Sequence, residues 1–344
     1  MKYKNLLFIA ACALSAVAHS QTGSATACLK ASDPSECLIA VATTRLKNEK
    51  SSEERIDGYA SLITSLAKSD IRKDDLFNQA IDDESAPAKS RWSLMLARKV
   101  YATRFNISNA DIETPQKIEN LANSLRAKYD GIDRMMIVWD ACEAREGEKV
   151  EALISWGGVL DRLCKLDESD VDSLEKEIPG MSAMTMPMID AYNRDERALS
   201  ESIQRSLKVL DGYQNLVEKS RTKTDKEAFR GIIAMGHWFN AIALATSGSA
   251  NASTKAMDIA LAQLSEASIG KRSIESQLMV ANASWIYAKA GAQERAKKSI
   301  GSALKDLDKA RGGSVSDRAA VIGMVIEALH ELKSQVKRSK KSEK

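Results

Sequence analysis

The sequence predicts an all-α protein built from antiparallel helix hairpins. Of its 344 residues, 44% are hydrophobic and only 5% are aromatic, a composition rich in helix formers and poor in the residues that build sheets. The chain has five prolines, which suits long helices joined by short turns. Apolar residues also recur at helical spacing nearly throughout, with clear stripes at 56–66, 279–287 and 321–332.

The N-terminal segment predicts export. Lys2 and Lys4 form a positive start, residues 6–17 form an apolar run, and small residues occupy suitable cleavage positions up to Ser20. We expect residues 1–20 to be a signal peptide cleaved near Ser20, and the mature protein to be periplasmic or secreted.

A lipid anchor is the alternative to simple cleavage. Ile9, Ala10 and Ala11 precede Cys12 as in a lipoprotein cleavage box, but the apolar run continues past Cys12. We therefore favour removal of the leader. No later stretch approaches the ~20 apolar residues that a membrane helix needs, so we expect no transmembrane segment.

Cys28 and Cys37 are expected to form a disulfide. Four cysteines follow the leader, and an even number in an oxidising compartment favours pairing. Asp33 is placed to cap a helix, with Pro34 at its first position and Glu36 closing a capping box. Cys37 then lies in the first turn and Cys28 on the segment that leads into it.

The second cysteine pair, Cys142 and Cys164, is left open by the sequence. If two helices turn near Glu146, Cys142 lies about 7 Å along one helix and Cys164 about 26 Å along the other. That separation is too wide unless Gly157-Gly158 breaks the second helix and folds it back. The alternative is a pair of free, buried thiols.

A weak internal repeat organises the chain into hairpins. Helices with apolar stripes are expected to open at intervals of about 36 to 46 residues, and such intervals are typical of helix-hairpin solenoids. The expected openings follow Arg55, Arg91, Arg134, Arg272 and Arg318, with two intermediate ones near Gly180 and Lys226.

The second half of the chain resembles a tetratricopeptide-like or HEAT-like helical-repeat array. Residues 285–291 (WIYAKAG) close a first helix and 296–300 (AKKSI) run through the next, with small residues at Ala283, Ala288 and Ala296. The regular 34-residue spacing is absent, and the first half matches less well. The resemblance implies a right-handed α-solenoid of antiparallel helix hairpins, a class of binding scaffolds without a cofactor.

Residues 21–332 are expected to form the repeat domain, with a boundary between two halves near 178. Residues 333–344 hold six basic residues against Glu343 and predict a disordered tail, which either keeps the protein in solution or touches an anionic envelope polymer. The net charge is +3, and since the tail and leader supply the excess, the body is acidic. No nucleic-acid partner is expected.

No catalytic constellation is evident. His237 and His330 lack metal-ligand partners at usual spacings, and His237 is expected to fill a seam between helices. Ala191-Tyr192-Asn193 resembles a fragment of lytic transglycosylases, but that family's catalytic Glu-Ser is missing. Seven carboxylates have the spacing of solvated helix faces: Asp130, Asp133, Asp140, Glu143, Asp190, Asp195 and Glu196.

The segment 179–188 is unusually rich in methionine. Met181, Met184, Met186 and Met188 match the thioether ligands that Cu(I) prefers. Met181, Met184 and Met188 also have the spacing of a core stripe, and Pro187 is expected to interrupt the helix. Core packing is the favoured interpretation; an adaptable peptide groove and copper binding are alternatives.

The predicted function is therefore non-catalytic. We expect an exported helical-repeat protein that presents a concave surface to a protein or peptide partner in the periplasm, with contacts along the first helices of successive hairpins. A periplasmic Cu(I)-binding protein and an enzyme that acts on cell-wall glycan are the alternatives.

Overall fold

The structure confirms the all-α class. The computed structural model describes residues 24–107, 115–147, 157–267, 274–309 and 313–342, and within these ranges every regular element is a helix. None of the described helices is long and apolar enough to cross a membrane. The leader and its cleavage position lie outside the described residues.

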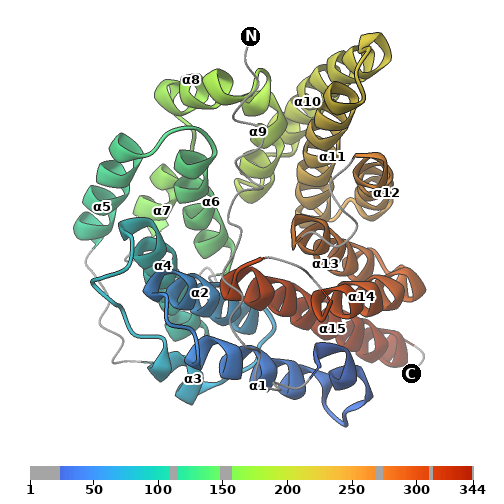
Figure 1. The fold of residues 1–344 in the computed structure, drawn as a ribbon. Helices are drawn as coiled ribbons and strands as arrows, with labels where there is room; N and C mark the ends of the chain where they lie inside the picture. The colour runs from blue at the N-terminus through green and yellow to red at the C-terminus, as the bar shows by residue number, and fades with distance from the viewer. Residues whose placement is uncertain (1–23, 108–114, 148–156, 268–273, 310–312, 343–344) are drawn as a thin grey trace.

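Seven helices stand around a common centre, and each packs against the next (Figure 1). They begin close to the seven positions expected from the sequence. The inner helices are α2 (Ser52–Lys68), α4 (Ala88–Arg104), α6 (Gly131–Gly147), α9 (Met181–Tyr192), α11 (Lys223–Thr246), α13 (Ile274–Lys289) and α15 (Val315–Ser342).

The remaining helices cover the outside of this inner row. For example, α10 packs against α9 and α11, and α12 packs against α11 and α13. The outer elements are the 3-10 helix η2 (Ala25–Lys30) and helices α1 (Pro34–Lys47), α3 (Asp74–Gln79), α5 (Pro115–Lys128), α7 (Gly157–Leu163), α8 (Glu168–Glu177), α10 (Glu196–Lys219), α12 (Ala250–Glu266) and α14 (Gln293–Leu307).

The row of inner helices closes on itself. Helix α15 packs extensively against α2 and also contacts α1, so the last inner helix meets the first (Figure 1). An open solenoid is therefore not confirmed, and its handedness stays a prediction. Whether the two ends of such an array meet depends on the small rotation between successive repeats. The sequence pattern does not predict this rotation.

The contact between α2 and α15, here called the closure seam, depends on a close approach of the two helices. A Cβ atom added to Gly323 would lie 2.5 Å from Ser65 Oγ, so only glycine fits without a shift. The Ser65 hydroxyl donates to Glu327 across the seam at 2.7 Å, and Ser316 donates to Glu54 through its amide and its hydroxyl.

Asp308, just after α14, holds the N-terminal segment against the C-terminal hairpin. Its carboxylate accepts hydrogen bonds from the hydroxyls of Ser24 and Thr26 and from the amides of Ala25 and Thr26. Arg45 lies 3.7 Å away. Burial alone would raise the pKa of Asp308, but these hydrogen bonds hold that pKa below its ordinary value.

The predicted disulfide between Cys28 and Cys37 is present, with their Cα atoms 5.3 Å apart. It joins η2 to the first turn of α1. Asp33 caps α1 as expected by accepting from two amides of the first turn. The predicted capping box is not completed by Glu36, whose carboxylate instead pairs with Lys73 of the neighbouring hairpin at 2.6 Å.

Cys142 and Cys164 also pair, with their Cα atoms 4.7 Å apart. Helix α7 begins at Gly157, and the residues before it, on which the expected break of the second helix depends, lie outside the described residues. Both sulfurs are fully buried in a small apolar cluster with Val138, Ile189 and Tyr192. The alternative of free thiols is wrong.

The predicted disordered tail is helical over most of its length. Helix α15 continues to Ser342, Lys333 lies 3.7 Å from Asp33, and the Gln335 side chain donates to the carbonyl of Ala288. Once the core residues of α15 anchor a helix, extending it by good helix formers is easy. Basic residues also favour the C-terminal end of a helix.

Candidate functional site

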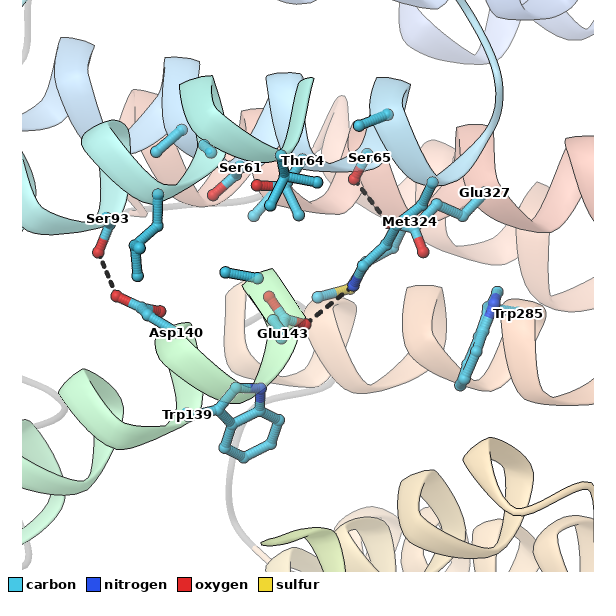
Figure 2. A pocket seen from close by; sticks show the side chains of 18 of the residues that line it. Ser61, Thr64, Ser65, Ser93, Trp139, Asp140, Glu143, Trp285, Met324 and Glu327 are labelled. Atoms are coloured by element: carbon cyan, nitrogen blue, oxygen red, sulfur yellow. Dashed lines mark hydrogen bonds and ion pairs between the residues drawn. The ribbon is translucent and has the colours of Figure 1, made fainter. Parts of the chain in front are cut away.

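A cavity of about 610 Å³ occupies the centre of the ring and is lined by side chains from all seven inner helices. Figure 2 shows it from close by. Its size falls within the range of about 300–1,000 Å³ that is typical of ligand pockets. The cavity lies on the inner faces of these seven helices.

The carboxyl of Asp140 on α6 is the most perturbed group in the cavity. It accepts a hydrogen bond from Ser93 of α4 (Figure 2). The pKa of Asp140 is raised to about 7, chiefly by burial and in part by the nearby carboxyls of Glu143 and Asp57, while the Ser93 hydrogen bond and Lys89 oppose the change. Near neutral pH, Asp140 therefore exists in both protonation states.

Asp57 on α2 lines the same cavity and behaves similarly. Its pKa is raised to about 6, chiefly by burial and in part by Glu53 and Glu54. A hydrogen bond from the Ser90 hydroxyl and the charge of Lys89 oppose the increase. Two helices thus present partly buried carboxyl groups that are poised to change charge between about pH 6 and pH 7.

The basic side chains around these carboxyls are paired with other acids. Lys68 forms an ion pair with Glu143 at 3.0 Å, and Lys89 forms one with Asp133 at the rim of the cavity. In the described part of the chain, no ion pair joins Asp57 or Asp140 to a basic side chain. Their charge is compensated only by hydroxyl hydrogen bonds and by Lys89 at longer range.

Aromatic rings complete the lining. Trp139 neighbours Asp140 on α6, and Trp285 stands on α13 (Figure 2). Trp139 packs edge-on against Phe239 with ring centroids 5.8 Å apart, and the Lys289 ammonium lies 4.8 Å from the centroid of Trp285. Tyr192 lines the cavity from α9. The lining therefore offers apolar ring faces beside carboxyl groups.

The wall opposite α6 is formed by α13 and α15. Glu327 reaches the cavity from the closure seam, where Ser65 donates to it. Asn282 directs its amide nitrogen toward the Met324 sulfur at 3.7 Å. Its amide oxygen is buried and accepts no hydrogen bond from the described residues. That oxygen is enclosed within the wall and is not exposed to the cavity.

The methionine segment packs into the core. Met181, Met184 and Met188 are at most 1% exposed, and the Met184 sulfur lies against Gly236 of α11. The core stripe is confirmed, whereas the expected interruption is wrong because α9 continues through Pro187. Met186 is only partly buried. Copper binding by these four residues stays a prediction.

The other predicted residues divide between structural roles and the cavity. His237 is buried in α11, as expected for a seam residue, and burial lowers its pKa. His330 lines the cavity. Within the described ranges, no group of three or more His, Cys, Asp or Glu side chains is arranged to hold a metal.

The carboxylates predicted to face solvent do so only in part. Asp133 is exposed and Asp195 caps α10, but Asp140 and Glu143 face the cavity. That expectation was wrong because the centre of the ring is itself polar, so its helix faces resemble solvated ones. Sequence reasoning also missed Asp57 and the two tryptophans; their only signal was their place on the expected inner helices.

Comparisons of the chain with protein-family models, with curated proteins and with solved structures found no match.

Proposed function

We propose that this is an exported, non-catalytic binding protein that holds a segment of a protein or peptide partner in its central cavity. The observation that carries the proposal is the convergence of all seven inner helices on one cavity lined by carboxyls, hydroxyls and indole rings. Few, well-placed polar groups within an enclosed space are what ligand sites require.

A peptide segment suits this lining because it combines backbone N–H groups with varied side chains. The carboxylate of Glu327 can accept hydrogen bonds from such a backbone. Trp139 and Trp285 offer ring faces for its side chains. Export is supported by the two disulfides, since such bonds persist in oxidising compartments.

Capture of a partner from a periplasmic extract tests the proposal, with the cavity filled as the decisive variant. Thr64→Trp places a large ring in the cavity lining, whereas Thr224→Trp makes the same change at an exposed site near the start of α11. We expect a partner that is retained by the wild type and by Thr224→Trp and lost with Thr64→Trp. Capture that persists with Thr64→Trp, or no partner above background, contradicts the proposal.

A second candidate, an enzyme that acts on cell-wall glycan, is favoured by one observation. Asp57 and Asp140 lie in the same cavity as two tryptophans. Glycoside hydrolases use a pair of carboxyl groups, one protonated and one ionised, to cleave the glycosidic bond. This candidate requires release of soluble fragments from peptidoglycan. It also requires that Asp140→Asn abolish release while the protein stays folded.

A further inference from the structure

In the described part of the chain, the carboxyls of Asp57 and Asp140 form no ion pair that would compensate their negative charge. Both are partly buried, and the nearest bases are engaged elsewhere, Lys68 with Glu143 and Lys89 with Asp133. An ionised carboxyl withdrawn from water is costly unless a positive charge compensates it. The cavity therefore favours a ligand that brings a positive charge to the wall formed by α2, α4 and α6.

The same wall offers what a long cationic side chain needs along its stem. Leu96, Ala97 and Val100 line the cavity from α4, and apolar surface of this kind accommodates the methylene groups of lysine. Trp139 also lines the cavity from α6, but its ring leaves the helix in a different direction from the Asp140 carboxyl (Figure 2). Carboxyls and apolar surface thus occur together on the wall formed by α2, α4 and α6.

We propose that the partner segment inserts a lysine side chain whose ammonium group is bound by the carboxylates of Asp57 and Asp140. This rests on the proposed function, because it specifies the chemistry of the segment that the cavity holds. The ammonium replaces the missing counter-ion, and its methylene stem lies along the α4 residues.

Binding of a cation at this wall is coupled to pH. The charged groups that face Asp140 are Asp57 from α2, Lys89 from α4 and Glu143 from its own helix. A bound ammonium favours the ionised form of both aspartates, so it lowers their pKa values and releases protons. The affinity therefore rises as the pH rises through about 6 to 7 and falls in acid.

Calorimetric titration with three probes tests the inference. The first is a tripeptide with blocked ends and a central lysine, the second is the same peptide with that lysine acetylated, and the third is 1,5-diaminopentane. The titrations are repeated with Asp140→Asn, with Asp57→Asn and with Asp172→Asn, a matched charge change at an exposed residue of α8. Circular dichroism verifies that each variant is folded.

We expect the lysine peptide to bind at least about tenfold more tightly than the acetylated one. Asp140→Asn and Asp57→Asn should each reduce that affinity by a similar factor, and Asp172→Asn should leave it unchanged. At pH 6.5 the heat of binding should depend on the ionisation enthalpy of the buffer, because protons are released.

The contrary outcomes separate this inference from the proposed function. Equal affinity for the lysine and acetylated peptides overturns cation recognition and leaves peptide binding intact. Binding of diaminopentane as tight as that of the peptide retains cation recognition but contradicts a peptide as its source. If none of the three probes binds, the inference is wrong, and the capture experiment with Thr64→Trp decides the proposed function independently.

Discussion

The closure seam between α2 and α15 and the cavity wall formed by α2, α4 and α6 share one helix but differ in chemistry. At the seam, Gly323 lets the backbones approach, and the Ser65 hydroxyl meets the Glu327 carboxylate directly. At the wall, Asp57 and Asp140 are partly withdrawn from water, and no ion pair within the described ranges joins either to a base. Serine hydroxyls donate to carboxyls in both regions, but at the wall burial raises the pKa of these carboxyls.

We therefore expect the seam to stabilise the fold and the wall to bind a ligand. A site that must bind a charged group keeps its own charges uncompensated, which destabilises the free protein. Close packing and buried apolar surface at the seam offset this destabilisation. Substitutions in the two regions should therefore change stability in opposite directions.

The largest expected effect is the loss of the disulfide behind the cavity wall. Replacing Cys142 and Cys164 by serine removes a bridge with a sequence separation of 22, and the loop-entropy estimate for such a bridge is about 3 kcal/mol. The Cys28–Cys37 bridge has a separation of only 9, so its removal should cost less. Denaturant titration of both double variants measures the two free energies of unfolding, and the reverse order would contradict this account.

Crowding the seam should be the next largest effect. Gly323→Ala places a methyl group 2.5 Å from Ser65 Oγ, and we expect a loss of about 1–3 kcal/mol because packed helices must separate. Gly301→Ala on the outer helix α14 is the matched control, since nothing lies within 4 Å of its added Cβ. The control should gain roughly 0.5–1 kcal/mol from helix propensity. Equal effects at the two glycines would show that the seam is not tightly packed.

Removing the charge of Asp140 from the cavity wall, by Asp140→Asn, should stabilise the protein at high pH. Because the pKa of Asp140 is raised to about 7 from 3.8, the folded state binds more protons than the unfolded state between these values. The contribution of this group to the free energy of unfolding thus falls as the pH rises from about 4 to about 7. A full shift of this size corresponds to about 4 kcal/mol. Because Asp140 is only partly buried, solvent screening reduces the penalty that Asp140→Asn removes to on the order of 1–2 kcal/mol at pH 8, and the penalty is absent near pH 4.

Thermal unfolding at several pH values tests this effect. The melting temperature of Asp140→Asn should exceed that of the wild type at pH 8, and the two curves should converge in acid. Asp172→Asn controls for the change in net charge. A lower melting temperature at pH 8 for Asp140→Asn alone would mean that the carboxylate is well compensated after all.

The smallest effect is a coupling within the seam. Ser65→Ala removes the Oγ atom that lies closest to the methyl group of Gly323→Ala. The double variant should therefore be more stable, by about 0.5–1 kcal/mol, than the sum of the single changes implies. A double-mutant cycle measures this coupling, and strict additivity would show that the helices relax elsewhere.

Much of the fold could be predicted from the sequence because the helices obey local rules. The openings near Arg55, Arg134 and Arg318 correspond to the starts of α2, α6 and α15, and helical periodicity alone defined them. The Cys28–Cys37 bridge followed from the capping signal at Asp33. The predicted interruption at Pro187 was wrong, because α9 accommodates a proline at its seventh position within a buried helix.

The site could not be predicted, because its residues come together only when the ring closes. Asp57 and Asp140 lie on different hairpins, and each sits on a helix face whose alternation of polar and apolar residues matches that of a solvent-facing helix. Trp139 and Trp285 are similarly far apart in the chain. Periodicity distinguishes apolar from polar faces, but it does not distinguish a polar interior from the outside.

The contacts made by Asp308 have a consequence for how the molecule reaches its native state. Ser24 and Asp308 are 284 positions apart in sequence, and helix α2 completes its packing only against the last helix. Such high contact order slows folding. During synthesis from the N-terminus, the early inner helices form first, and their apolar faces stay exposed until α15 is made. Until α15 packs against α2, the partly folded chain is prone to aggregation and to proteolysis.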